Sequence, residues 1–394
     1  MARPLEYDPY AYEVHEDPYP LYRALRDEAP LYKSEALEFW ALSRHSDVLS
    51  ALKDFETFSN RNGVSLDRDA FHPGADATMS FLAMDPPRHT RMRSLVSRGF
   101  TPRRVSDLEP RIRELAARYL DECAERGGCD FIADFAGKLP MDVISELLGL
   151  PVGDRAMLRG WADTVVHREP GLVGLPPAAA GAALQLLQYF QAHVAERRTR
   201  PRGDDLTEAL LEAQIEGDRL SEREILGFLF LMVIAGNETT TKLLANALYW
   251  LWLNPEQRNR LRADPSLVPN WVEETARYDN STQALARVVA RDTELYGTRL
   301  HEGEKVVLLI GSANRDERAF GDPDRYDLLR NTRASLSFGH GTHFCLGAAL
   351  ARLEGRVALE EVWRRFPEYD VEPEGIVRVH SVNVRGFAAL PVKF

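Results

Sequence analysis

Cysteine is scarce in this chain of 394 residues, which contains only Cys123, Cys129 and Cys345. An odd and low count argues against a disulfide-stapled scaffold and suits a reducing compartment such as the cytosol. Stability must therefore come from burial of apolar residues. With 44% hydrophobic and 28% charged residues, a chain of this length can bury a large core.

Sequence features that direct a protein to membranes or nucleic acid are also missing. The first twenty residues are charged and proline-rich and lack the apolar stretch of a secretory signal. The uncharged run over residues 225–237 is shorter than the roughly 20 residues that span a bilayer. The net charge of −11 disfavours nucleic acid as a partner. We therefore expect a cytoplasmic protein that binds neither membranes nor nucleic acid.

No internal repeat or low-complexity linker divides the chain, so we predict a single domain over residues 1–394. Apolar residues recur every three or four positions over residues 108–126 and 139–150, which indicates helices. Strand-like segments are fewer, with one at residues 37–42 and two or three within residues 284–310. The pattern favours a mainly α-helical chain with β-rich patches.

One long apolar helix is predicted to begin after Ser221. Ser221 and Glu224 form a capping-box pattern, and Pro255 disfavours helix at Asn254 before it. Such a helix has about 32 residues and a length of roughly 48 Å, so it crosses the whole protein. Its middle reads AGNETTTK, residues 235–242, where glycine costs about 1 kcal/mol and a buried carboxylate needs a partner. We infer that this stretch has a function that offsets these costs.

The segment SFGHGTHFCLGAALAR delivers Cys345 to the start of another predicted helix. A thiolate is favoured there by the helix dipole and by free N–H groups. Gly339 and Gly341 allow tight turns, and Gly347 leaves space for a flat group beside the sulfur. Phe338 could shield the sulfur from water.

Two other interpretations of Cys345 remain open at this point. A lone cysteine is commonly a small buried hydrophobic residue. Zinc could bind Cys345 together with His343, but structural zinc needs four ligands. No second Cys/His pair with suitable spacing is present, because a helix end and a Gly-Gly turn separate the other two cysteines.

The cysteine segment also resembles a known family signature. The pattern F-x-x-G-x-H-x-C-x-G is similar to the haem-binding motif of the cytochrome P450 family, and it is carried here by Phe338, Gly341, His343, Cys345 and Gly347. The pattern is long, so chance matches are rare.

Further landmarks of that family occur in the expected order. Glu274 and Arg277 match the E-x-x-R pair, which the family uses as a buried structural lock. Residues 235–240, AGNETT, match the oxygen-activating motif, and residues 313–330 match the segment before the cysteine loop. Residues 85–93 resemble the helix that contacts the haem propionates. The resemblance implies a mainly α fold, a helical triangular prism with a smaller β-rich lobe and a long central helix over the haem.

The resemblance implies haem b (iron protoporphyrin IX) as the cofactor, with Cys345 as the metal ligand. Thiolate ligation favours O–O cleavage. Ala235 and Gly236 would leave space for O2 above the iron. The other implied cofactor-binding residues comprise the propionate-binding cations and the cysteine loop, namely His89, Arg93, Arg287, Phe338, Gly339, His343 and Gly347.

Thr239 and Glu238 are the implied catalytic residues. Thr239 would donate a hydrogen bond to the bound oxygen, and Glu238 would relay protons from solvent, since O–O scission needs protons. Gly236 and Thr239 would open a local groove in the helix. The alternative is a threonine-rich helix whose hydroxyl groups bond back to the carbonyls four residues earlier.

The implied activity is monooxygenation, in which one oxygen atom of O2 enters a small or medium apolar organic substrate by hydroxylation or epoxidation. A peroxide-driven, coupling or nitrating haem-thiolate enzyme is an alternative. A catalytically silent haem-binding partner protein is another, although such a protein would be expected to lose the cysteine or the acid–alcohol pair.

Electrons would come from separate proteins, an acidic ferredoxin and its NAD(P)H-dependent reductase. Residues 88–104 contain six arginines and no acidic residue, which stands out in a chain of net negative charge. We predict that this stretch, extended by Arg352 and Arg356, docks the ferredoxin through complementary charge. The alternative is a solvated basic helix.

Overall fold

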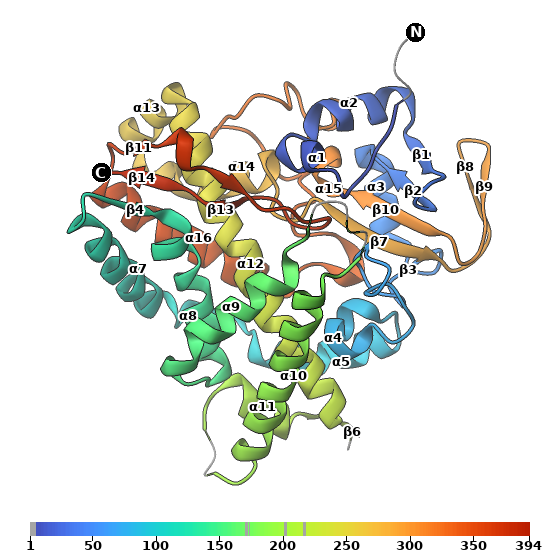
Figure 1. The fold of residues 1–394 in the computed structure, drawn as a ribbon, viewed down its shortest axis with the longest axis horizontal. Coiled ribbons are helices and arrows are strands. Elements are labelled where there is room, and N and C mark those ends of the chain that lie inside the picture. Colours follow the sequence, from blue (N-terminus) through green and yellow to red (C-terminus); the bar gives the residue numbers. More distant parts are fainter. Residues whose placement is uncertain (1–4, 170–171, 173, 201–202, 216–217) are drawn as a thin grey trace.

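Helices dominate the structure and fill a roughly triangular body, with the largest sheet gathered at one corner (Figure 1). The computed structural model describes residues 5–169, 172, 174–200, 203–215 and 218–394. The α-helices are α1 (Tyr12–Glu16), α2 (Tyr19–Glu28), α3 (His45–Lys53), α4 (Asp76–Met79), α5 (Arg88–Val96), α6 (Pro102–Ser106), α7 (Glu109–Ala124), α8 (Lys138–Leu148), α9 (Arg155–Val166), α10 (Pro177–Arg197), α11 (Leu206–Glu212), α12 (Glu222–Leu253), α13 (Pro255–Ala263), α14 (Val268–Tyr278), α15 (Ile310–Ala313) and α16 (Ala348–Arg365).

The strands are short. They are β1 (Leu31–Ser34), β2 (Phe39–Leu42), β3 (Phe58–Ser59), β4 (Gly128–Asp130), β5 (Gln214–Ile215), β6 (Asp218–Arg219), β7 (Ala284–Val289), β8 (Thr293–Leu295), β9 (Thr298–Leu300), β10 (Lys305–Leu309), β11 (Asp370–Val371), β12 (Val377–Arg378), β13 (Phe387–Ala389) and β14 (Pro391–Lys393).

The main sheet has the strand order β1-β2-β10-β7-β3. Strand β10 runs parallel to β2, and the other neighbours in this sheet are antiparallel. The strand predicted near the start is β2, which begins two residues later than expected. The predicted late β-rich stretch contains four strands, β7 to β10, where two or three were expected.

Helix α12 is the long helix that the sequence predicts. Its capping box is formed, because the Ser221 side chain accepts from the Glu224 N–H while the Glu224 carboxylate accepts from the Ser221 N–H. Asn254 caps its other end, just before Pro255. The helix is continuous through residues 235–242, so the expected groove is not a break in the helix. It contacts α4, α8, α9, α10, α14 and α16.

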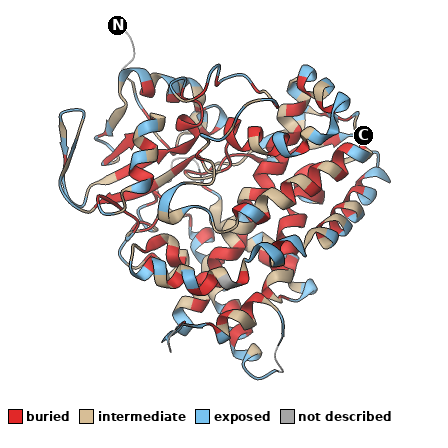
Figure 2. Cartoon of the chain, turned by 180° about the vertical axis from the view of Figure 1, so that it is seen from behind, coloured by how far each residue is buried: buried red, intermediate tan, exposed pale blue. Residues whose placement is uncertain are grey.

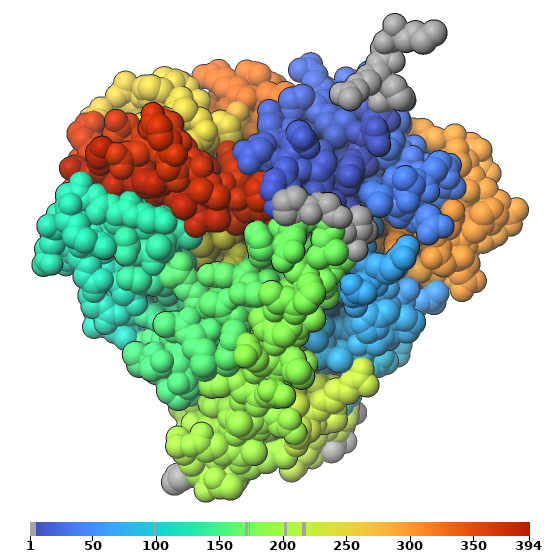
Figure 3. All heavy atoms as spheres, in the orientation of Figure 1, coloured from blue at the N-terminus to red at the C-terminus, as the bar shows by residue number. Residues whose placement is uncertain are grey.

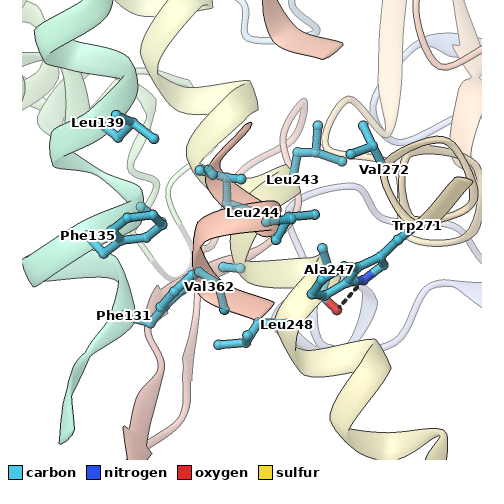
Figure 4. Close-up of a cluster of buried hydrophobic side chains, with 14 of the residues drawn as sticks. Phe131, Phe135, Leu139, Leu243, Leu244, Ala247, Leu248, Trp271, Val272 and Val362 are labelled. Atoms are coloured by element: carbon cyan, nitrogen blue, oxygen red, sulfur yellow. Dashed lines mark hydrogen bonds between the residues drawn. The ribbon is translucent and has the colours of Figure 1, made fainter. Parts of the chain in front are cut away.

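Two hydrophobic clusters meet along α12, and its polar stretch lies between them. One cluster extends along α12 to Val233 and joins it to α8, α9, α10 and α11. The other begins at Leu243 and joins α12 to α7, α14 and α16. Figure 4 shows the second, where Trp271 donates its indole N–H to the Ala247 carbonyl at 3.0 Å. The polar stretch therefore sits at the junction of two cores and belongs to neither.

Burial explains why α12 is apolar over most of its length. Among the described helices it is the one that is long and apolar enough to cross a membrane, yet 78% of its most apolar window is buried inside the protein. Figure 2 shows buried residues along the inner elements and exposed residues on the outer helix faces. Its apolar character is that of a core helix in a globular protein.

Segments distant in sequence close one face of the molecule. In Figure 3 the N-terminal segment meets the C-terminal segment and the middle of the chain. His15 Nδ1 lies 3.3 Å from His380 Nδ1, and the Arg168 N–H donates to the His380 carbonyl at 3.0 Å. The interior of the protein is therefore covered on this side by both ends of the chain.

Candidate active site

The cysteine loop and α12 enclose one cavity. From α12, Ala235, Gly236, Thr239, Thr240 and Leu243 face it. The opposite side is formed by the cysteine loop, which contributes Phe338, Gly339, His343, Cys345 and Gly347. Further apolar residues complete the wall, including Phe81, Leu82, Leu231, Met232 and Leu285. The tertiary structure thus brings together two motifs that are about a hundred residues apart in sequence.

The loop conformation depends on glycine at two positions. Gly339 has φ +69° and Gly341 has φ +68°, a region that favours glycine. A Cβ atom at Gly341 would also lie 2.9 Å from the Leu52 carbonyl oxygen. The Cys345 N–H donates to the Phe338 carbonyl at 2.8 Å, which closes the loop. Beside the cysteine, no described atom lies within 4 Å of a Cβ built on Gly347, so this position leaves open space.

Cys345 is exposed, although it faces an internal cavity and is surrounded by protein. Burial raises the pKa of the Cys345 thiol, while the Gly347 N–H and the cations Arg93 and Arg352 oppose that rise. The protein alone therefore favours the protonated thiol. A metal ion bound to the sulfur would reverse that preference, because a coordinating thiol is deprotonated.

Four nitrogen-bearing side chains near this cavity have few or no hydrogen-bond acceptors. Both ring nitrogens of His89 and His343 are buried without a hydrogen-bond partner, and so is one terminal nitrogen of Arg93. Arg287 is 2% exposed, and its one recorded hydrogen bond goes to the Ala286 carbonyl. Buried cations without counter-ions are costly. This donor set suits a ligand with carboxylates, as the two propionates of haem would provide.

The pKa values of these groups also show that their charged forms are disfavoured. Burial and the Arg93 charge lower the pKa of His89 to about 4. Burial, together with Arg287, His89 and Arg93, lowers the pKa of His343 to about 2. Burial lowers the pKa of Arg287 to about 10. Each positive charge disfavours a second one nearby, so the two imidazoles stay neutral without a ligand, and a bound anion would favour their protonated forms.

The comparisons with known proteins agree with this geometry. The family model for cytochrome P450 matches residues 180–378. Putative cytochrome P450 123 of Mycobacterium tuberculosis is 58% identical over 386 residues, which cover 98% of this chain and 96% of that protein. The chain is a cytochrome P450. The cofactor of this family is haem b, and the enzyme is a P450 monooxygenase.

Solved P450 structures confirm the predicted fold. CYP109E1 from Bacillus megaterium, in complex with testosterone, has a TM-score of 0.90 and 34% identity, covering 97% of this chain and 99% of that one. CYP109Q5 from Chondromyces apiculatus has a TM-score of 0.88 and 36% identity, covering 98% and 97%. The haem prediction is confirmed at the level of the family. Cys345 is exposed and so is not a buried hydrophobic residue, and no group of three or more possible metal ligands lies among the described residues.

Behind the cysteine loop, the P450 has a buried ion pair at the predicted E-x-x-R position. Arg277 donates to both carboxylate oxygens of Glu274, at 2.8 and 2.7 Å. Arg277 also donates to the Asn314 and Pro323 carbonyls, and Arg330 donates to Glu274 at 3.1 Å. Every partner here belongs to the segment before the cysteine loop or to α14. The pair is therefore structural, as the sequence predicts.

The two predicted catalytic residues lie on different sides of α12. Thr239 faces the cavity of Cys345, and its hydroxyl donates back to the Ala235 carbonyl at 2.8 Å, as the alternative interpretation expected. Glu238 is 2% exposed and faces a second cavity across the helix. Its carboxylate lies 3.2 Å from the Lys242 ammonium. The structure thus does not bring the two side chains into one cavity.

Sequence reasoning missed the surroundings of Glu238. Lys242 was visible as its neighbour four positions on, which is helix ion-pair spacing. Asp163 interacts with Glu238 from α9, and no sequence signal indicated that approach. Only the packing of α9 against α12 creates it.

The arginines of residues 88–104 do not form a free cationic surface. Arg93 points inward, and the side chain of Arg98 lies outside the described residues. The others have acidic partners: Arg88 with Asp76, Arg91 with Asp218 and Glu224, Arg103 with Asp107, and Arg104 with Asp204. Arg352 and Arg356 are paired too, with Glu273 and with Glu109 and Glu360. The excess of positive charge seen in the sequence is therefore largely neutralised by residues from other segments.

Proposed function

We propose that this P450 acts as a single domain that hydroxylates or epoxidises a small or medium apolar organic molecule in the cytoplasm, with O2 as co-substrate. The observation that carries the proposal is the cavity in which an exposed cysteine sulfur and an apolar wall meet His343, behind which His89, Arg93 and Arg287 gather. The relative CYP109E1 is described with testosterone bound, which supports an apolar ligand of that size class.

Each group of residues around the cavity has a separate proposed role. Cys345 would hold the iron, and Gly347 would allow the porphyrin to lie flat beside the sulfur. His89, Arg93, Arg287 and His343 would bind the propionates. When bound, the haem supplies the oxidising chemistry with O2. Leu82, Leu231, Met232, Leu243 and Leu285 would orient the substrate and exclude water.

Thr239 and Glu238 would deliver protons from solvent to the site of oxygen activation. The Thr239 hydroxyl lies at the cavity wall, and rotation away from the Ala235 carbonyl would direct it inward. Glu238 holds an acidic group on the far side of the helix, beside a cavity that brings solvent. Substitution of Thr239 by alanine is expected to release more hydrogen peroxide per NAD(P)H consumed. Unchanged coupling would count against this role.

Electrons would arrive from an acidic ferredoxin and its NAD(P)H-dependent reductase. A surface hollow lies beside the cysteine loop, lined in part by Arg333, His340, Phe344 and Arg352. Phe344 is 41% exposed and directly precedes Cys345. This surface, rather than the paired arginines of residues 88–104, is the proposed docking face. Ferredoxin-driven reduction should then slow as ionic strength rises.

A carbon monoxide difference spectrum of the reduced holoenzyme tests the central assignment. Thiolate ligation by Cys345 predicts a far-shifted Soret band, which should vanish in Cys345→Ser. A far-shifted band that persists in Cys345→Ser would contradict the assignment.

The substrate class can be found by measuring the change of the iron spin state on addition of terpenoids, steroids, fatty acids, aromatics and macrolides. Turnover with NAD(P)H and both redox partners, compared with turnover on peroxide, separates monooxygenation from peroxide-driven oxidation. A silent haem protein would show neither.

A further inference from the structure

Helix α12 separates two cavities. Ala235, Thr239 and Leu243 face the cavity of Cys345, whereas Glu238 and Lys242 face the second one. The second cavity is lined by α9, α12, the segment before α8 and the β12–β13 strands: Ile132, Ala133, Arg159, Asp163, Thr164, Val166, His167, Glu238, Thr241, Lys242, Val377, Arg378, Val379, His380 and Ala388. Glu238 is thus the inner acid of a cavity that several charged residues line, on the opposite side of α12 from the proposed site of oxidation.

Glu238 is poorly satisfied for a buried carboxylate. It is 2% exposed, and neither of its carboxylate oxygens makes a hydrogen bond with a described residue. Lys242 lies 3.2 Å from one of these oxygens and is itself 5% exposed in its side chain. One ammonium at this distance offsets the charge but leaves the second oxygen without a donor.

The position of Lys242 is fixed from the opposite side. A Cβ atom built on Gly386 would lie 2.6 Å from Cβ of Lys242 and 2.8 Å from two further stem carbons. Glycine at this position therefore allows the lysine stem to lie flat against the chain. The stem of Lys242 thus packs against Gly386, and its ammonium lies 3.2 Å from the Glu238 carboxylate.

Asp163 supplies a second carboxyl at this point. It approaches Glu238 from α9, which packs against α12, and both side chains line the second cavity. Its side chain is 49% exposed, so it also meets solvent in the cavity. The Arg159 guanidinium lies 3.7 Å from it and is anchored by hydrogen bonds to the Ile132 and Ala133 carbonyls.

Two facing carboxyl groups hold together only if a proton lies between them. Burial and the Glu238 carboxylate raise the pKa of Asp163 to about 7, while Arg159 and Lys242 oppose the rise. The other charged or titratable groups that face the cavity are His167, Arg378 and His380. The pair therefore keeps one proton until the pH passes about 7, and it loses that proton at higher pH.

We propose that Asp163 is a positioning residue for proton supply, sharing a proton with Glu238 and linking that carboxyl to solvent in the second cavity. The inference rests on the proposed relay role of Glu238. Asp163 transfers the shared proton to Glu238, Glu238 gives it up toward the cavity of Cys345, and a proton from solvent water returns to Asp163. Only O–H bonds form and break in these steps.

The decisive measurement is the infrared difference spectrum of the ferric holoenzyme between about pH 6 and about pH 8, one unit on either side of the pKa. The wild type should lose a protonated-carboxyl band over this interval, and Asp163→Asn should lack that change. The matched control is Glu196→Gln, which alters an acid on α10 with 51% exposure and an Arg200 partner four residues on. The control should keep the band, and an unchanged band in Asp163→Asn would overturn the proposal.

A second readout is NAD(P)H-driven O2 consumption, which needs no identified substrate. In the wild type, the rate should decline as the pH rises through about 7, because the shared proton is lost. Asp163→Asn should lower the rate roughly tenfold and abolish this pH dependence, and Asp163→Glu should restore the rate and the pH dependence. If Glu238→Gln lowers the rate while Asp163→Asn does not, the proposal for Asp163 is wrong and the role of Glu238 stands. If Glu238→Gln has no effect, the proposed relay itself is wrong.

Discussion

Two groups of buried charge flank the cysteine loop of this P450. Behind the loop, Glu274, Arg277 and Arg330 form a set in which the acid and both cations have close partners. Beside the sulfur, His89 is equally enclosed and His343 is half-buried, and the ring nitrogens of both have no acceptor in the described part of the chain. The first group has its hydrogen-bond and charge partners within the protein, whereas the second group lacks such partners among the described residues.

The difference separates structure from function on physical grounds. A buried charge costs several kcal/mol unless paired and hydrogen-bonded, so a folded protein can keep it unpaired only where another interaction offsets the cost. The Glu274–Arg277 pair therefore serves the fold. In the proposed assignment, Arg287 and its neighbours would instead bind the two haem propionates. Substitutions in the first group should lower the stability of the fold, whereas substitutions in the second group should weaken haem binding and leave the fold stable.

The largest effect is expected from Glu274→Gln. The substitution leaves the Arg277 guanidinium buried with one carboxylate charge missing, and breaking such a pair costs about 3–5 kcal/mol. The free energy of unfolding, measured in urea, should fall by this amount and the yield of folded holoenzyme should fall with it. A loss below about 1 kcal/mol would place this pair among surface-like ion pairs.

Arg287→Leu should act on the cofactor. Losing one charge-assisted hydrogen bond to a propionate costs about 1.5–3 kcal/mol, which corresponds to roughly 10- to 100-fold faster haem loss. The stability of the haem-free protein should stay equal or rise, since an unpaired buried cation is removed.

The matched control for Arg287→Leu is Arg291→Leu, because Arg291 follows the same strand and is 59% exposed in its side chain. Haem loss to an acceptor protein is the measurement. Equal rates in the two variants would contradict the assignment of the cations to the propionates.

Glu354 extends the comparison to a buried acid on α16 without a cation. It is 3% exposed, one of its carboxylate oxygens has no recorded partner, and burial raises its pKa well above the ordinary value. Its charged form is disfavoured in the folded state, so stability falls as the pH rises above the ordinary pKa of a glutamate. Glu354→Gln should remove this fall and add about 1–3 kcal/mol at neutral pH, with little change in acid. The measurement is the thermal midpoint of unfolding as a function of pH. If the profiles of the wild type and Glu354→Gln run parallel, this prediction is wrong.

A surface counterpart gives the smallest effect. Ser221 caps α12 in an exposed capping box, where lost hydrogen bonds are partly replaced by water. Ser221→Ala should cost about 1 kcal/mol in urea unfolding and leave the haem spectrum unchanged. A larger cost would mean that this end of α12 contributes more to the fold than its exposure indicates.

Local patterns in the sequence predicted local structure well. The capping box of Ser221, the end of α12 before Pro255 and the turns at Gly339 and Gly341 depend on a few adjacent residues. The Glu274–Arg277 pair follows from helix spacing once the family is recognised. Predictions that depended on more distant residues were less complete. The basic stretch looked free in sequence, but its arginines meet acids up to 133 residues away.

The sequence by itself determined the family, the cofactor and the ends of the central helix, because each depends on residue types at fixed short spacings. Tertiary structure decided which side of α12 Glu238 faces, that Asp163 of α9 meets it, and which buried cations lack partners. The physical reason is that electrostatic satisfaction depends on distances across packed helices, and those distances appear only when the chain is folded.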